Sequence, residues 1–313
     1  MAALPLRSDL EAGGMGIVAP EWGARWYGDH GDRRRKRRRR FEAGSGQRYV
    51  VPSPLPGPLL GFDAAESSFR DDLARLGALQ DRYQRELAGG GIHENALESV
   101  RVELTYHSNA IEGSTLSLRE TQLILEGVTP PGSRPVRELY EARNHDRALR
   151  LIERWCKDRV GDWTITEDDL LAIHAVVLSD IDPAWAGRYR SGRVLIAGSR
   201  FVPPGPHKFP ELLPVVMERV NRVPALTHPV LLAAECHYNL VAIHPFVDGN
   251  GRTARLMMNL VLLRAGFPLA VIEVGERSTY LTALDEANEG RSDAFAGLVI
   301  AAAERSLRRL LGD

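Results

Sequence analysis

Apolar residues recur at helical spacing along most of the chain, from about residue 66 to residue 311. One short run, RVLIAG at 193–198 followed by SRFVPP, has strand character instead and predicts a single β-hairpin. No internal repeat of 20–50 residues is apparent. The pattern therefore predicts an all-α fold with one small hairpin. The predicted helices cover 66–88, 94–112, 117–126, 136–158, 167–179, 209–223, 229–243, 252–265, 278–288 and 292–311.

The first 61 residues lack this periodicity. RRRKRRRR at 33–40 holds eight of the 40 Lys and Arg residues, so the rest of the chain is acidic although the net charge is only −1. Adjacent cations repel one another and cannot share a core, and the prolines of 44–61 favour extended structure. We expect 1–61 to be a disordered basic and Pro-rich tail and linker, 62–160 an N-terminal helical region, and 161–313 the core of the fold. Nucleic-acid binding by the run stays an alternative to a solvated tail or a wrongly chosen start codon.

The composition bears on the compartment in which the protein works and on whether it spans a membrane. No stretch approaches the roughly 18 consecutive apolar residues that a membrane span requires. Asp9 and Glu11 interrupt the N-terminus before an apolar signal-peptide core. Two cysteines, Cys156 and Cys236, are too few for a disulfide framework. We expect a protein of the reducing cytoplasm, without a membrane partner.

The stretch HPFVDGNGRTAR at 244–255 lies between two predicted helices. Backbone N–H groups that lead into a helix N-terminus attract anions, and Gly249 and Gly251 let the backbone approach a ligand closely. Arg252 and Arg255 add positive charge that suits phosphate oxygens. The segment therefore predicts a polyphosphate site.

Two further residues of this stretch suggest chemistry. Asp248 beside the phosphates would suit Mg²⁺, which takes one or two carboxylates plus phosphate oxygens, so the ligand looks like a nucleoside triphosphate. His244 could take a proton near neutral pH and activate a hydroxyl. A metal site from His237, His244 and Cys236 is less favoured, because no third ligand follows at zinc spacing.

The stretch resembles the HPFx[D/E]GNGRxxR signature of the Fic family of protein adenylyltransferases, and no defined position departs from it. The likeness continues through GRYRSGRVLIAG at 187–198, RAGFP at 264–268 and RSTYLTALDEANEG at 277–290, and covers roughly 62–311. It implies the Fic fold. It also implies that His244 deprotonates a Ser, Thr or Tyr hydroxyl of a target protein, which attacks the α-phosphate of ATP; AMP is transferred and pyrophosphate leaves.

The resemblance assigns the other site residues too. Asp248 would hold Mg²⁺, Phe246 would anchor the loop in the core, and the hairpin would be a flap on which an extended segment of the target docks. The implied ATP-binding residues are Val194, Leu195, Ile196, Ala197, Asp248, Gly249, Asn250, Gly251, Arg252, Arg255, Tyr280 and Asn288.

A second stretch, SNAIEG at 108–113, resembles the family's inhibitory pattern of Ser or Thr, three residues, then Glu and Gly or Asn. On a helix over 94–112, Ser108 lies on the apolar stripe and Glu112 projects from nearly the same face. The resemblance implies that Glu112 pairs with Arg255 and withholds that arginine from ATP. A solvated Glu before a helix-ending Gly is the simpler alternative.

Other functions stay open. The same scaffold could remove AMP or transfer another phosphate-containing group, the basic run could make a nucleic-acid-binding regulator, and the fold could be a catalytically silent interaction module. The expected partners are ATP and a target protein, with nucleic acid disfavoured. The sequence does not decide the oligomeric state, a homodimer included.

Overall fold

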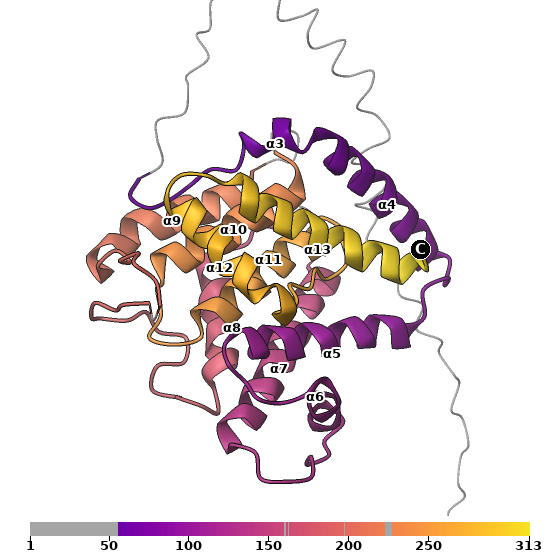
Figure 1. Ribbon diagram of the computed structural model, residues 1–313, viewed down its shortest axis with the longest axis horizontal. Helices are drawn as coiled ribbons and strands as arrows, with labels where there is room; N and C mark the ends of the chain where they lie inside the picture. The colour runs from indigo at the N-terminus through magenta and orange to yellow at the C-terminus, as the bar shows by residue number, and fades with distance from the viewer. Residues whose placement is uncertain (1–55, 160, 162, 197, 223–226) are drawn as a thin grey trace, which may run out of the picture.

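The computed structural model describes residues 56–159, 161, 163–196, 198–222 and 227–313, so most of the predicted tail lies outside the described residues (Figure 1). None of the helices in these ranges has the length and apolar character that crossing a membrane requires. The elements are α3 (Ala65–Ser68), α4 (Arg70–Ala88), α5 (Glu94–Ile111), α6 (Leu118–Leu125), α7 (Val136–Asp158), α8 (Glu167–Leu178), η1 (Pro206–Lys208), α9 (Phe209–Val220), α10 (Pro229–Ile243), α11 (Asn250–Arg264), η2 (Val274–Glu276), α12 (Arg277–Asn288) and α13 (Asp293–Leu311).

The predicted helices form, and their ends have local causes. Ser117 and Thr166 cap α6 and α8 with reciprocal capping boxes, so each supplies an acceptor for a backbone N–H that the helix leaves free. The helix predicted over 66–88 is divided at Phe69, whose φ of −114° and ψ of 23° leave the helical region. α11 begins two residues earlier than predicted, because Gly249 adopts the left-handed conformation that ends the preceding loop.

The centre of the fold is the pair α10 and α11, which pack against each other (Figure 1). Nearly every residue of both helices is buried. α13 packs on α10 and on α4, while α5, α7 and α8 contact α11. The loop between the two central helices is residues 244–249, so the core fixes both of its ends.

The expected β-hairpin at 193–198 is wrong for the part that the structure describes. Residues 193–196 belong to no strand, and Leu195 is 80% exposed. The amide of Ser199 donates to the carbonyl of Ile196 at 3.2 Å, which is a turn and no strand ladder. An isolated two-stranded hairpin is marginal in water, and the short apolar run had no sheet to join. Ala197 lies outside the described residues.

Candidate active site

His244 ends α10 with its backbone in the left-handed region, at φ 50° and ψ 58°. It is the only non-glycine residue with positive φ in the described part of the chain. Such a backbone is unfavourable for a residue with a side chain and is typical of functional positions. Since a carbonyl only accepts, the 3.3 Å contact of His244 Nδ1 with Val241 O puts the proton on Nδ1 and leaves Nε2 free to take one. Burial lowers the pKa of His244 below its usual 6.5 and favours the neutral ring.

Arg190 fixes the carbonyl of His244, and the sequence analysis gave it no role. Its buried guanidinium donates to the carbonyls of His244 at 2.7 Å, Gly192 at 2.5 Å and Pro204 at 2.6 Å. Its charge disfavours protonation of the nearby imidazole and so helps to lower the pKa of His244. Its only signal in the sequence was its place within GRYRSGR.

Hydrogen bonds and a stacked ring hold the loop after His244 in place. Asn250 Oδ1 accepts from the Phe246 amide, and Asn250 Nδ2 donates to the Phe246 carbonyl, both at 2.9 Å. His174 stacks on Phe246 with ring centroids 3.6 Å apart. His174 Nδ1 accepts from Gly187 N–H at 3.1 Å, so its Nε2 carries the proton and donates to the Asp248 carbonyl at 3.0 Å. Burial lowers the pKa of His174 to about 4, which keeps this bridge neutral.

The first turn of α11 holds an anion, and that anion is the Glu112 carboxylate. Its oxygen Oε1 lies so close to Gly251 that a Cβ there would collide with it. It also pairs with Arg255 Nη2 at 2.6 Å. The free N–H groups of a helix N-terminus favour negative charge, so Glu112 occupies the place predicted for phosphate.

The guanidinium of Arg255 is 1% exposed and almost completely paired. Its Nε donates to Ser108 Oγ at 2.9 Å and its Nη2 to the Ser108 carbonyl at 2.8 Å, while Nη1 lies 3.4 Å from Tyr280 Oη. Burial opposes ionisation of Glu112, but the charge and hydrogen bond of Arg255 together with the charge of Arg252 outweigh it and leave the pKa of Glu112 below its usual value. The structure therefore brings Ser108, Glu112 and Arg255 together as the sequence predicted.

The other predicted ATP-binding residues lie around this cluster or away from it. Tyr280 is buried against Arg255 and His237, whose Nε2 is 3.3 Å from its hydroxyl. Asn288, at the end of α12, accepts from Tyr238 Oη at 3.3 Å. Val194, Leu195 and Ile196 lie on the open loop after Arg190.

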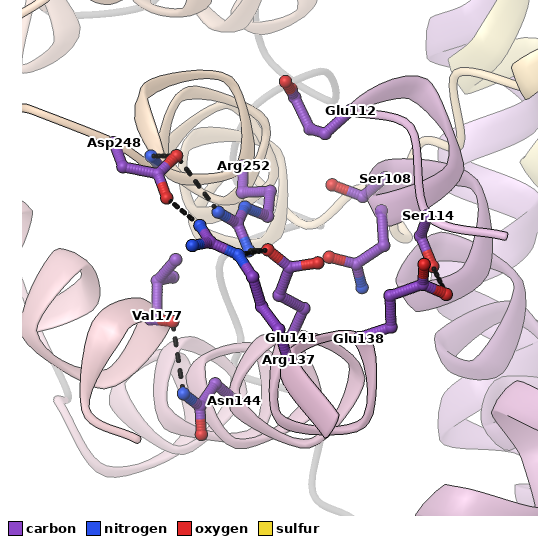
Figure 2. A network of polar contacts seen from close by, with 12 residues as sticks. Ser108, Glu112, Ser114, Arg137, Glu138, Glu141, Asn144, Val177, Asp248 and Arg252 are labelled. Atoms are coloured by element: carbon purple, nitrogen blue, oxygen red, sulfur yellow. Dashed lines mark hydrogen bonds and ion pairs between the residues drawn. The ribbon is translucent and has the colours of Figure 1, made fainter. Parts of the chain in front are cut away.

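A cavity of about 290 Å³ opens beside Asp248. Figure 2 shows Asp248 and the neighbouring residues Arg137, Glu141 and Arg252 of its lining. Asp248 Oδ1 accepts from Gly249 N–H at 2.6 Å, and Oδ2 pairs with Arg137. Burial alone would raise the pKa of Asp248. The charges of Arg252 and Arg137 and the bond from Gly249 N–H outweigh this effect, so the pKa lies below its usual value and the carboxylate is ionised. The cavity is lined by Glu112, Gly113, Ser114, Pro135, Arg137, Glu138, Glu141, Asp248 and Arg252.

The alternative metal site has no counterpart in the described residues. No group of three His, Cys, Asp or Glu side chains gathers there at metal-binding distance. His237 is buried against Tyr280 and Phe295, and burial places its pKa well below 6.5. His237 and Cys236 are therefore core residues of α10.

Known proteins resemble this chain in sequence and fold. The Fic/DOC family profile matches residues 164–262. Protein adenylyltransferase fic-1 of Caenorhabditis elegans is 40% identical over 226 residues, 70% of this chain and 44% of that protein. A solved structure of a fragment of C. elegans Fic-1 superposes with a TM-score of 0.69 and 34% identity, over 80% of this chain and 73% of the fragment. The chain belongs to the Fic family.

Other Fic proteins extend this picture. Protein adenylyltransferase Fic of Nematostella vectensis is 38% identical over 236 residues, 75% of this chain and 54% of that protein. A Fic family protein from Desulfovibrio desulfuricans superposes with a TM-score of 0.65 and 26% identity, over 83% of this chain and 77% of that one. The chain spans about half the length of these curated relatives.

Two residues that contact the Fic motif escaped the sequence analysis for a common reason. Arg137 and Glu141 form an (i, i+4) ion pair on α7, with Nε and Oε1 3.0 Å apart. Such pairs are usual on solvated helix faces, so the sequence alone does not mark them. Only the fold brings them to Asp248 and Arg252.

Proposed function

We propose that this chain is a protein adenylyltransferase that transfers AMP from ATP to a Ser, Thr or Tyr hydroxyl of a target protein and releases pyrophosphate. The names of its Fic relatives and the complete motif support this. The observation that carries the proposal is the anion site: a carboxylate, Glu112, rests on the first turn of α11 and on Arg255 beside a neutral histidine. A triphosphate tail is the ligand whose charge suits these groups.

In this reaction His244 is the general base. Nδ1 bonded to the Val241 carbonyl leaves Nε2 to accept the proton of the target hydroxyl. The hydroxyl oxygen then forms a bond to the α-phosphorus as the bond from that phosphorus to the β-bridging oxygen breaks. The proton stays on Nε2 and pyrophosphate leaves. The lowered pKa of His244 keeps the base unprotonated at neutral pH.

The phosphates are bound by the first turn of α11 together with Arg252 and Arg255. Arg252 is 3% exposed, and its Nε has no hydrogen-bond partner among the described residues. A buried donor without a partner is unfavourable, so an incoming phosphate oxygen gains a full hydrogen bond. The backbone of Gly249, Asn250 and Gly251 lies beside it, and Asn250 keeps that backbone in place through its bonds to Phe246.

The residues present fit Mg²⁺. Asp248 offers one carboxylate that is 44% exposed and faces a cavity, and Mg²⁺ in nucleotide sites commonly takes one or two carboxylates together with phosphate oxygens. Asp248 would hold the ion, which would neutralise phosphate charge when bound. ATP and Mg²⁺ are therefore the expected substrate and cofactor.

Glu112 makes this enzyme autoinhibited. Its carboxylate and the terminal phosphate would need the same space beside Gly251 and the same guanidinium of Arg255. Ser108 holds the other edge of Arg255 from within α5. ATP therefore has to displace Glu112 to align its α-phosphate.

The target protein docks on the loop after Arg190. Leu195 and Val202 are 80% and 64% exposed there, so two apolar side chains are available to a partner on a loop that Arg190 ties to the His244 carbonyl. Residues 193–196 also form no strand ladder, so their backbone groups can pair with an extended segment.

ATP labelled at the α-phosphate, compared with ATP labelled at the γ-phosphate, tests the proposal. Glu112→Gly should acquire the α-label by self-modification or on proteins of a lysate, and the γ-label should not be incorporated. His244→Ala is the matched control and should acquire neither. Incorporation of the γ-label would indicate phosphorylation, and no incorporation of either label by Glu112→Gly would contradict the transferase assignment.

A further inference from the structure

Four charged side chains at the wall of the cavity form a closed ring of alternating sign (Figure 2). Arg137 and Glu141 come from α7, and Asp248 and Arg252 come from the motif. Arg137 pairs with Asp248 Oδ2, and its Nε donates to Glu141 Oε1 at 3.0 Å. Glu141 Oε1 lies 3.2 Å from Arg252 Nη1, and Arg252 Nη2 lies 3.4 Å from Asp248 Oδ1. Each residue of the ring therefore has two oppositely charged neighbours.

The two arginines of the ring differ in how firmly they are held. The side chain of Arg252 is 3% exposed, whereas that of Arg137 is 58% exposed. Exposed ion pairs typically contribute only about 0–1 kcal/mol, because water competes for both partners. Arg137 is therefore the member of the ring that a stronger cation can displace.

Asp248 has one oxygen available for such a cation. Its Oδ1 already accepts from Gly249 N–H at 2.6 Å, and Oδ2 faces the cavity, where Arg137 pairs with it. A guanidinium and a divalent cation repel each other and cannot share this oxygen. Glu141, with its side chain 15% exposed, can retain Arg137 through the 3.0 Å bond to Nε after the Asp248 contact breaks.

We propose that Arg137 is a positioning residue that occupies the metal-binding oxygen of Asp248 in the nucleotide-free protein and sets the Mg²⁺ concentration at which ATP binds. The inference rests on the proposed ATP- and Mg²⁺-dependent function. Arg137 keeps the Asp248 carboxylate oriented toward the cavity. Free Mg²⁺ binds this carboxylate more weakly, because it first has to displace the guanidinium. A metal–nucleotide complex displaces the guanidinium, because its phosphates add contacts that the bare ion lacks.

The test is a MgCl₂ titration at fixed ATP, followed by the melting temperature of the protein and by a fluorescent ATP analogue, so that no catalysis is needed. Arg137→Gln should lower the half-saturating Mg²⁺ concentration about two- to fivefold, the range that an exposed pair of up to about 1 kcal/mol allows. Mn²⁺ binding in the absence of nucleotide, followed by electron paramagnetic resonance, should become stronger in the same variant.

Arg147→Gln is the matched control. Arg147 lies on the same helix, and its side chain is 56% exposed. It forms an ion pair of 2.8 Å with Asp180, which is not a residue of the motif. It should leave the Mg²⁺ titration unchanged, and Arg137→Lys should fall between wild type and Arg137→Gln. An unchanged or higher Mg²⁺ requirement in Arg137→Gln, or weaker ATP binding at saturating Mg²⁺, would overturn the inference. A shifted titration without any AMP transfer would instead leave the inference standing and refute the proposed transferase.

Discussion

The carboxylate of Glu112 joins the ends of two helices, because it follows the last residue of α5 and pairs at 2.6 Å with Arg255 of α11. The C-terminal end of α5 disfavours its charge, while the N-terminal turn of α11 and the guanidinium favour it. The pair is also uneven: the Arg255 side chain is 1% exposed and that of Glu112 is 43% exposed. Water therefore reaches the anion and not the cation, so the anion is the partner that a ligand can replace.

Replacing Glu112 by Gly should raise AMP transfer about tenfold or more, because Arg255 and the first turn of α11 become available to ATP. The variant should be less stable than wild type without ATP by about 1–3 kcal/mol, since a buried guanidinium loses one charged hydrogen bond. It should gain more stability from ATP and Mg²⁺, which bind only the folded state. Self-labelling and thermal unfolding with and without nucleotide measure both effects.

A double variant serves as the control for this release. Glu112→Gly with Arg255→Ala should lose the activation, because the released guanidinium is absent. Equal labelling of wild type and Glu112→Gly at saturating ATP would remove the autoinhibition and leave the transferase assignment intact.

Replacing His244 by Ala should reduce AMP transfer about 10²–10⁴-fold, the usual contribution of a general base. ATP binding should persist, because the phosphate contacts come from α11. Retention of more than about a tenth of the activity, with the ratio of kcat/KM as the measure, would show that His244 is not the base.

The pH dependence of transfer follows from the lowered pKa of His244. The base acts in its neutral form, so activity should rise with pH through the folded-state pKa, and the midpoint of this rise should lie below the ordinary value of 6.5. Profiles of kcat/KM for Glu112→Gly between pH 5 and pH 8 measure this limb. A limb centred above 6.5 would contradict the effect of burial on this ring.

Replacing Asp248 by Ala should weaken ATP binding in the presence of Mg²⁺ far more than in its absence. The Gly249 amide loses an acceptor, so we expect a loss of stability of only about 1 kcal/mol. Asp248→Asn retains an acceptor for this amide and removes the charge, so it should weaken metal-dependent binding without the loss of stability. Calorimetric titration with ATP, with and without Mg²⁺, separates the two roles.

Acid should destabilise the protein before its carboxylates titrate. Burial lowers the pKa of His145 to about 3, and of His174 and His228 to about 4. Above pH 6.5 these rings are neutral in the folded and the unfolded state, so they do not lower the free energy of unfolding. Between about pH 6.5 and pH 4 the unfolded chain takes protons that the folded one does not, so each histidine removes up to about 1.4 kcal/mol per pH unit.

Urea unfolding at pH 7 and pH 5 measures this loss. His145→Gln should make the loss smaller, whereas replacing the exposed His207 by Gln should leave it as in wild type. Equal stability of the wild-type protein at the two pH values would mean that these rings take up protons without unfolding.

The helices were predictable because each carries a local signal, an amphipathic stripe or a cap, as at Ser117 and Thr166. The pairing of Glu112 with Arg255 was predictable only through the family resemblance. The two residues lie 143 positions apart, so no local pattern in the sequence links them. The apolar run at 193–198 predicted a β-hairpin, and this prediction failed for the described residues because a strand needs a partner that the local sequence does not supply.

Contacts made only by folding were not predictable. Phe69 divides a helix whose apolar spacing continues through it. Tyr280 was assigned to the ATP site only through the resemblance, and the contacts of its hydroxyl with Arg255 and His237 are ones that a helical spacing cannot reveal. Arg137 reaches Asp248 from 111 residues away and resembles any solvated arginine in sequence.

The single guanidinium of Arg190 ties the carbonyl of His244 to both ends of the neighbouring loop, at Gly192 and Pro204. Arg190 therefore fixes the two ends of this loop relative to His244 and makes no hydrogen bond to the described side chains between them. We expect the length and side chains of this loop to vary without moving the His244 backbone, because the anchoring bonds are made by backbone carbonyls that every residue possesses. Under the proposed function, the choice of docking partner and the geometry of proton transfer at His244 would then be independent properties of one short stretch of chain.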